Sequence, residues 1–491
     1  MKRPKYPSLY QVNTRVWLTE LSQDLGRKAT LDDIPDIELD RLANLGFDWI
    51  WFLSVWTTGE LGRKVSRENP EWLGDFENTL PDLYEEDIAG SGFAIAAYHV
   101  HPELGGDPAL KKLRARLKKR GLKLMLDFVP NHMGPDHPWV EDHPDYFVSG
   151  TESDLEHYPQ NYTRVKRNQG ELILAYGRDP YFAGWPDTLQ LDYSNPATVK
   201  AMTKELLRIS GQCDGVRCDM AMLILPEVFE KTWGRKAQAF WSSAIKAVRE
   251  KVPGFCFMAE VYWEMEWDMQ QLGFDYAYDK RLYDRLSEGH TKAVREHLFA
   301  VPDYQDKLAR FLENHDEPRA AATFDLKKHE AAAVITFLSP GLRFFHQGQF
   351  EGRKKRISPH LVRAPQEPTE PALHKFYTNF LSLIKKPVFR DGHWQQLECK
   401  SAWDGNGSSD FFLAFAWEGK DNDRVLVVIN YSCHAGQCLV RLPFSELGGK
   451  PVRFSEMMST AFYDWEGSEV VSKGIFIDLP AWGFHIFEIG V

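Results

Sequence analysis

One structural unit recurs along most of the chain: an amphipathic helix, a glycine and then a short apolar strand. In residues 107–128, "DPALKKLRARLKKRGLKLMLDF", the helical leucines fall on one face and Gly121 precedes an apolar strand. Residues 195–219 repeat the unit, with Asn195 as the capping residue and Pro196 in the first helical position. Apolar strands that alternate with helices are typical of a parallel sheet covered by helices.

Eight strands of this kind are predicted from the sequence. They fall at about residues 9–14, 49–53, 122–128, 215–219, 255–260, 273–276, 309–313 and 342–345. Eight strand and helix units favour an α/β fold of the closed (β/α)8 TIM-barrel type. An open doubly wound sheet is the alternative, but no G-x-G-x-x-G turn follows any of these strands.

Two segments depart from this rhythm. Residues 133–188 are rich in proline, tyrosine, aspartate and glycine and are too long for an ordinary connection, which predicts an inserted domain over the barrel mouth. After about residue 389, alternating apolar residues and turn signals predict an antiparallel β-sandwich. We therefore predict a catalytic barrel of residues 1–132 and 189–388, an inserted domain B of residues 133–188 and a C-terminal domain C of residues 389–491.

Charge and apolar content restrict the partners. A net charge of −11 disfavours binding to nucleic acid or to an anionic membrane, and a neutral small molecule or oligosaccharide fits better. No apolar run approaches the roughly 20 residues needed to cross a bilayer, and none follows the basic start as a secretory signal would. The six cysteines are expected to be free thiols in a reducing compartment, so we expect a cytoplasmic protein. The oligomeric state is left open.

Polar residues follow four of the predicted strands directly, in the segments "DFVPNH", "GVRCD", "MAEVYW" and "ENHD". In an eight-stranded barrel, functional side chains lie at the carboxyl ends of the strands. Each residue taken alone has a simpler explanation, such as a helix cap or a buried histidine. The four strand ends nevertheless direct seven polar side chains to one face of the barrel: Asp127, His132, Arg217, Asp219, Glu260, His315 and Asp316.

These segments resemble, in order, the four motifs of the α-amylase superfamily, glycoside hydrolase family 13, and "LQLDY" at residues 189–193 resembles a further short motif. The resemblance covers about the whole chain. It implies that Asp219 is the nucleophile, that Glu260 is the general acid/base and that Asp316 holds substrate hydroxyls. It further implies that substrate is bound by Arg217, His132 and His315, with Asp127 as a structural partner of the arginine.

The chemistry of these residue types supports the same roles. Retaining cleavage of a glycoside needs two carboxyl groups about 5–5.5 Å apart, one to attack the anomeric carbon and one to protonate the leaving oxygen. Arg217 lies two residues before Asp219, on the same side of the strand, where it can hold that carboxylate ionised. Glu260 has apolar neighbours, which favour its protonated form. Phe93 and Trp263 are candidates for stacking on a sugar ring.

The sequence departs from the family pattern at two places. Phe93 replaces the tyrosine that commonly forms the stacking platform, so the ring is kept and the hydroxyl is lost. Met222 and Leu223 stand where many α-amylases have a lysine and a histidine that bind the leaving side and a calcium ion. We therefore expect no required cofactor or metal, with Asn131 as the matching ligand if calcium does bind.

Three functions are compatible with the sequence. The first is a retaining α-glycoside hydrolase that acts on α-glucosidic bonds of oligosaccharides or α-glucans, with short substrates favoured over starch. The second is a transglycosylase or isomerase that uses the same covalent intermediate. The third is a non-catalytic scaffold relative, which the presence of all three acids disfavours. The bond type, the chain length and the choice between water and a sugar as acceptor are not determined by these motifs.

Overall fold

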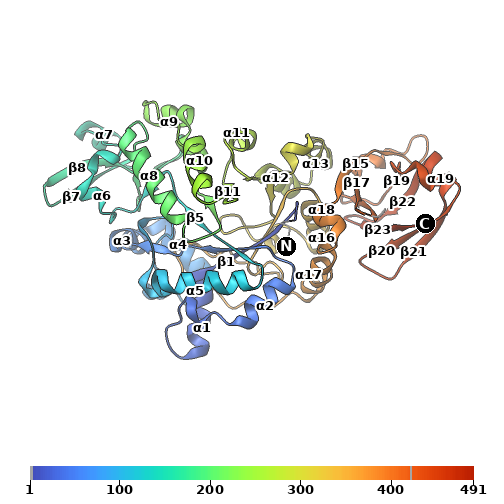
Figure 1. The fold of residues 1–491 in the computed structure, drawn as a ribbon, viewed down its shortest axis with the longest axis horizontal. Helices are drawn as coiled ribbons and strands as arrows, with labels where there is room; N and C mark the ends of the chain where they lie inside the picture. Colours follow the sequence, from blue (N-terminus) through green and yellow to red (C-terminus); the bar gives the residue numbers. More distant parts are fainter. Residues whose placement is uncertain (1–3, 421–422) are drawn as a thin grey trace.

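The computed structural model describes residues 4–420 and 423–491, and its centre is a closed barrel of eight parallel strands. Around the barrel the strand order is β1, β2, β5, β10, β11, β12, β13 and β14. Figure 1 shows the barrel between a small inserted lobe at one end and the C-terminal sheets at the other. The predicted fold class, a TIM barrel with an insertion and a C-terminal β domain, is confirmed. The strands are β1 Ser8–Asn13, β2 Trp49–Leu53, β5 Lys123–Phe128, β10 Gly215–Cys218, β11 Cys256–Ala259, β12 Tyr276–Tyr278, β13 Leu308–Arg310 and β14 Leu342–His346.

Two barrel strands differ from their predicted ranges. The strand predicted at 273–276 begins only at Tyr276, because Gly273 has a φ of 108° and ends the preceding helix. The strand predicted at 309–313 ends at Arg310, and Glu313 turns instead toward Arg319, with 2.5 Å between its carboxylate and the guanidinium. The first of these strands thus begins later than predicted and extends to Tyr278, whereas the second is shorter at its carboxyl end.

Amphipathic helices surround the barrel. Helix α8 begins at Pro196 and the Asn195 side chain accepts from Ala197 N, as the capping prediction requires. The helices that connect or cover the barrel strands are α1 Thr14–Leu25, α2 Asp36–Asn44, α5 Gly106–Lys119, α8 Pro196–Ile209, α9 Pro226–Trp233, α10 Trp241–Lys251, α11 Glu266–Gln271, α12 Lys280–Glu288, α13 Thr291–Leu298, α14 Pro302–Gln305, α15 Ala320–Thr323, α16 Leu326–Phe337, α17 Pro371–Ile384 and α18 Pro387–Asp391.

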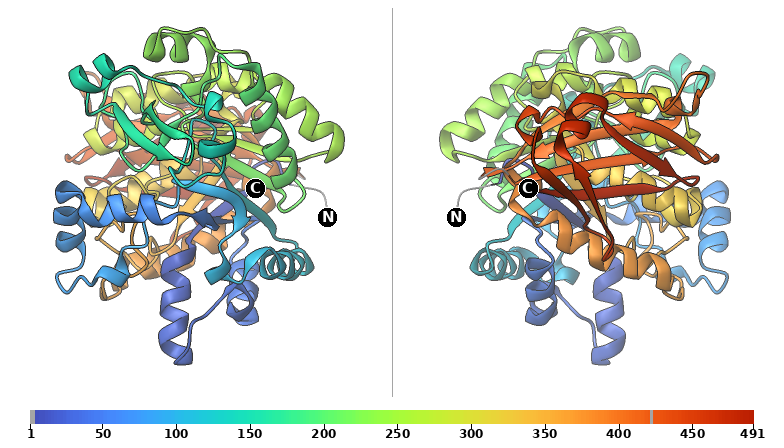
Figure 2. Two further views of the ribbon diagram at one scale, coloured as in Figure 1. Left: turned by 90° about the vertical axis from the view of Figure 1, so that its left-hand side faces the viewer. Right: turned by 90° about the vertical axis from the view of Figure 1, so that its right-hand side faces the viewer.

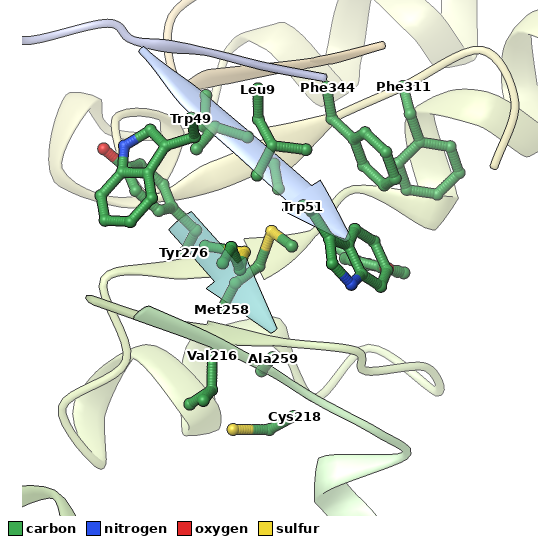
Figure 3. Packing of buried hydrophobic residues seen from close by; sticks show 14 of the residues in the cluster. Leu9, Trp49, Trp51, Val216, Cys218, Met258, Ala259, Tyr276, Phe311 and Phe344 are labelled. Carbon is green, nitrogen blue, oxygen red and sulfur yellow. The ribbon is translucent and has the colours of Figure 1, made fainter. Parts of the chain in front are cut away.

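The barrel interior is filled by side chains from several strands, as Figure 3 shows. Trp49 and Trp51 of β2, Met258 of β11 and Phe344 of β14 are all fully buried there. Trp51 contacts Phe344 with ring centroids 5.6 Å apart. This packed interior fixes the strand ends relative to one another, so side chains that follow the strands are held on a rigid base.

The segment predicted as an insertion leaves and rejoins the barrel through one short antiparallel pair. Strand β6, His132–Met133, pairs with β9, Leu189–Gln190, so the two ends of residues 133–188 lie side by side. Between them are α6 Trp139–Asp142, α7 Glu152–His157, β7 Tyr162–Arg167 and β8 Gly170–Ala175, with β7 and β8 forming a hairpin. In Figures 1 and 2 this lobe stands out from the side of the barrel.

A second excursion follows β2. Its elements are β3 Trp56–Thr58, α3 Glu60–Glu68, α4 Pro70–Thr79 and β4 Ile95–Val100, and β3 pairs with β4. Among residues 4–420 and 423–491, no helix is both long and apolar enough to cross a bilayer.

The C-terminal region is a sandwich of a six-stranded and a three-stranded antiparallel sheet. One face of the larger sheet packs on the barrel helices and the other covers the smaller sheet (Figure 2, right). The elements are β15 His393–Leu397, β16 Cys399–Ser401, β17 Phe412–Glu418, β18 Arg424–Asn430, β19 Gly436–Val440, β20 Pro451–Glu456, β21 Phe462–Glu466, α19 Gly467–Lys473, β22 Ile475–Leu479 and β23 Phe484–Gly490.

Candidate active site

A cavity of about 260 Å3 lies over the carboxyl ends of the barrel strands. Asp219 follows β10, Glu260 follows β11, and Asp316 lies in the loop after β13. These three carboxyl groups line the cavity together with His132 and Phe93. The barrel topology therefore brings together side chains that are separated by more than 200 positions in the sequence.

The Arg217 guanidinium joins the two central acids. Its Nη1 lies 2.6 Å from Asp219 Oδ1 and its Nη2 lies 2.7 Å from Glu260 Oε2. A further carboxylate oxygen, Asp316 Oδ2, is 3.9 Å from Nη2. Arg217 is in β10 and is fully buried, so one fixed cation holds the carboxyl groups of two neighbouring strands beside each other.

Glu260 is buried and held at both oxygens. The Tyr262 hydroxyl donates to Oε1 at 2.9 Å, and the backbone N–H of Met220 donates to Oε2 at 2.7 Å. Burial raises the pKa of Glu260 to about 8, in spite of the opposing effect of Arg217. The carboxyl group is therefore mostly protonated at neutral pH, as an acid catalyst must be.

His315 stands between the barrel floor and Asp316. Its Nδ1 is 2.8 Å from Nε2 of Gln11, an amide nitrogen that can only donate, so the proton of the neutral ring is on Nε2. That Nε2 lies 3.0 Å from Asp316 Oδ2. Burial lowers the pKa of His315 and raises that of Asp316 to about 6. The ring is thus neutral and lies directly beside the third carboxylate.

Asp127 lies beneath the cavity and does not line it. It accepts from Trp51 Nε1 at 3.2 Å and from Ser54 N at 3.0 Å, and it is 3.9 Å from Nη1 of Arg217. Burial raises its pKa to about 7. Asp127 therefore ties the arginine to β2 and its loop rather than contacting a substrate.

The predicted aromatic residues have different positions. Phe93 contacts the His315 ring, with centroids 5.4 Å apart, and the Arg217 guanidinium, 5.2 Å from the Phe93 ring centre. Trp263 was predicted to bind substrate, but it is 38% exposed, packs on Tyr181 and does not line the cavity. The neighbouring Tyr262, two residues after Glu260, lines the cavity instead.

Sequence reasoning missed part of the cavity wall. Trp72 comes from α4, Trp185 and Asp187 from the inserted lobe, and His360 from the loop after β14. His132 contacts the Trp185 ring, with centroids 5.3 Å apart. No spacing in the sequence connects these positions. The one available signal was the aromatic content of the inserted lobe and of the segment that follows β2.

The residues around Asn131 do not fit a calcium ion. The Gln190 amide nitrogen donates to Asn131 O at 2.9 Å, to Asn131 Oδ1 at 3.0 Å and to Leu191 O at 3.1 Å. Three oxygens that a cation would need are thus already bound by an uncharged donor. Among the residues that the structure describes, no group of three or more His, Cys, Asp or Glu side chains has the arrangement of a metal site.

The comparisons with known proteins agree with this geometry. The family model described as "Alpha amylase, catalytic domain" matches residues 36–422. A stretch of 189 residues is 30% identical to an α-1,4-glucan:maltose-1-phosphate maltosyltransferase of Burkholderia pseudomallei and covers 37% of this chain and 15% of that protein. Another of 315 residues is 23% identical to α-amylase 3 of Dictyoglomus thermophilum and covers 60% of each chain.

The matched stretches thus span less than two thirds of these curated relatives. Solved structures match over greater lengths. A maltogenic α-amylase from Thermotoga neapolitana superimposes with a TM-score of 0.70 and 18% identity over 99% of both chains. That similarity extends over the insertion, the barrel and the C-terminal sandwich.

Proposed function

This chain belongs to the α-amylase family, and from that membership we propose that it is a retaining α-glycosidase acting on α-glucosidic bonds. Its substrate is an oligosaccharide or an α-glucan. The observation that carries the proposal is the contact of Asp219 and Glu260 with the two terminal nitrogens of Arg217. Two carboxyl groups beside each other in one cavity, one ionised and one protonated, are what retaining cleavage needs.

The proposed reaction has two steps. Glu260 gives its proton to the glycosidic oxygen while Asp219 attacks the anomeric carbon, so the bond to the leaving sugar breaks and a covalent glycosyl ester forms. Glu260, now ionised, then removes a proton from water or from a sugar hydroxyl, whose oxygen displaces Asp219. Asp316 accepts hydrogen bonds from ring hydroxyls and offsets the positive charge of the transition state.

Arg217 and Asp127 support these steps without reacting. The arginine fixes the direction of the Asp219 carboxylate through a 2.6 Å contact, and Asp127 lies 3.9 Å from the same guanidinium, below the cavity. Phe93 and Trp185 offer flat apolar faces to the sugar, and His132 offers a ring nitrogen.

Transfer of the glycosyl group to a second sugar is the other candidate activity. The similarity to a maltosyltransferase favours it, because that activity and hydrolysis differ only in what attacks the covalent ester. Incubation with maltose, maltooligosaccharides and sucrose distinguishes the two: hydrolysis gives shorter sugars alone, and transfer also gives longer or rearranged ones.

The experiment that tests the proposed function follows the first released anomer by NMR during that incubation. We expect the α-anomer to form first and then to mutarotate. Release of the β-anomer first would mean inversion and would contradict the proposal, and so would the absence of any cleavage across the panel of α-linked sugars.

We also propose a reducing compartment such as the cytoplasm. All six cysteines are free thiols, and Cys213, Cys218, Cys256 and Cys438 are buried. We expect thiol titration of the denatured protein, purified without reductant, to count six thiols. A count of four or fewer would contradict this assignment.

A further inference from the structure

One side of the cavity is closed by residues that belong to none of the family motifs. Trp72 and His360 line it there, with ring centroids 4.7 Å apart. Behind them lies a small apolar cluster of Phe76, Leu80 and Ile88 with Leu361. This cluster joins α4, the 80–91 segment and the loop after β14, so the wall is packed and not a loose loop.

Backbone and side-chain bonds hold the wall in place. Ala89 N donates to His360 O at 2.9 Å, and Ile88 forms a β-bridge with Leu361. His360 Nδ1 is 2.8 Å from the Ser66 hydroxyl, and that hydroxyl donates to Gly62 O at 3.1 Å. These bonds therefore connect the segment that follows β2 to the loop that follows β14.

The barrel topology determines which end of the substrate contacts this wall. Glu260 follows β11, the fifth strand of the barrel, and the strand opposite it is β1, flanked by β2 and β14. Because Glu260 protonates the leaving oxygen, the leaving group lies on its side of the cavity. The sugar that becomes bonded to Asp219 therefore points toward the loops after β2 and β14, where Trp72 and His360 stand.

The wall also presents hydrogen-bond acceptors. When the Ser66 hydroxyl proton is donated to Gly62 O, Nδ1 of His360 carries the ring proton and Nε2 is an acceptor with no hydrogen-bond partner among the described residues. Burial lowers the pKa of His360 to about 3, so the ring is neutral. Asp187 lines the same cavity and is 3% exposed, and its Oδ2 makes no hydrogen bond to a described residue.

We propose that Trp72, His360 and Asp187 form a closed recognition site for the terminal sugar unit at the non-reducing end of a neutral α-glucoside, so that the enzyme removes or transfers one terminal unit at a time. This inference rests on the proposed function. Only a terminal unit has a free 4-hydroxyl that can donate to these acceptors, because in an internal unit that oxygen is part of a glycosidic bond. No lysine or arginine lines the cavity among the described residues, which favours an uncharged sugar over a phosphorylated one.

The test uses 4-nitrophenyl α-maltotrioside and the same compound blocked at its non-reducing end by a 4,6-O-ethylidene group. We expect the enzyme to release glucose first from the open substrate, and to cleave the blocked one at least about 100-fold more slowly. Cleavage of both at similar rates, or release of maltose first, would overturn the proposal. If neither is cleaved, and no α-linked sugar of the panel is either, the proposed function itself fails.

Two variants probe the wall directly. Trp72→Ala and His360→Ala are expected to bring the two cleavage rates to within about tenfold, by opening the far end of the cavity. Trp267→Ala is the matched control, since Trp267 is 43% exposed on α11 and packs on Tyr304 outside the cavity. If both wall variants are folded by circular dichroism and keep the wild-type ratio of the two cleavage rates, the wall does not contribute to this selectivity.

Discussion

At the scale of single residues, the two central acids differ in what surrounds them. Arg217 contacts both acids, but only Glu260 also accepts from the Tyr262 hydroxyl and the Met220 backbone N–H. Burial raises the pKa of Glu260 and so favours its neutral form, in spite of the opposing effect of Arg217. The surroundings of Glu260 therefore support its proposed role as the acid, which leaves Asp219 as the proposed nucleophile.

The pKa of Glu260, about 8, predicts the alkaline side of the pH profile. Because the first step needs the protonated form, kcat/KM should fall about tenfold per unit above that pH, and it should also fall below about pH 6, where Asp316 becomes protonated. The measurement is kcat/KM for 4-nitrophenyl α-glucoside across the pH range. In Tyr262→Phe, the Glu260 carboxylate loses a hydrogen-bond donor, so the alkaline limb of the profile should shift to higher pH. A wild-type profile that stays flat to about pH 10 would contradict the assignment of Glu260.

The sequence predicted the reacting residues better than the specificity residues. Asp219, Glu260 and Asp316 follow apolar strands of a recognisable period, so the barrel rule alone places them on one face. Trp72, Asp187 and His360 lie in three separate excursions, and only their tertiary packing brings them together. Trp263 does not line the cavity: it lies three residues after Glu260, whereas Tyr262, two residues after Glu260, is on the same side of the chain and lines it.

At the scale of elements, the short pair of β6 and β9 fixes the root of the inserted lobe and carries both His132 and Gln190. The Gln190 amide nitrogen donates to the two Asn131 oxygens and to Leu191 O. The sequence shows that position 190 is a glutamine, but it does not show these three hydrogen bonds, because they depend on the register of β6 and β9.

We predict that a metal chelator leaves the melting temperature unchanged. We also expect Gln190→Ala to lose about 1–3 kcal/mol of stability, because it removes the buried amide that donates to Asn131 Oδ1 and to two backbone carbonyls. Thermal unfolding with and without chelator measures both effects. A fall of several degrees in the wild-type protein on chelation would show that a bound metal stabilises it.

At the scale of the whole molecule, the C-terminal sheets are continuous with the barrel core. Trp417 of β17 is fully buried, donates from Nε1 to Leu338 O at 2.8 Å and packs edge-on against Tyr6. Tyr431, in the same buried core as Trp417, donates from its hydroxyl to Leu286 O of helix α12 at 2.7 Å. The period-two pattern predicted the sandwich, but its docking on the barrel depends on these contacts between distant segments.

This docking predicts that barrel and sandwich unfold together. Calorimetry should show one transition, and Trp417→Ala should lower the free energy of unfolding by about 3–5 kcal/mol. Trp403→Ala is the control, because Trp403 is 56% exposed in the same domain and should change stability little. Two well-separated transitions in the wild-type protein would mean that the two parts are energetically independent.

The whole account depends on a covalent bond between Asp219 and the sugar, and trapping that bond tests it most directly. A 5-fluoro-α-glucosyl fluoride should form a glycosyl ester that turns over slowly, and peptide mass spectrometry should find the added mass on Asp219. Asp219→Asn should be folded, inactive and unlabelled. A label on another carboxylate, or near-normal activity of Asp219→Asn, would contradict the account.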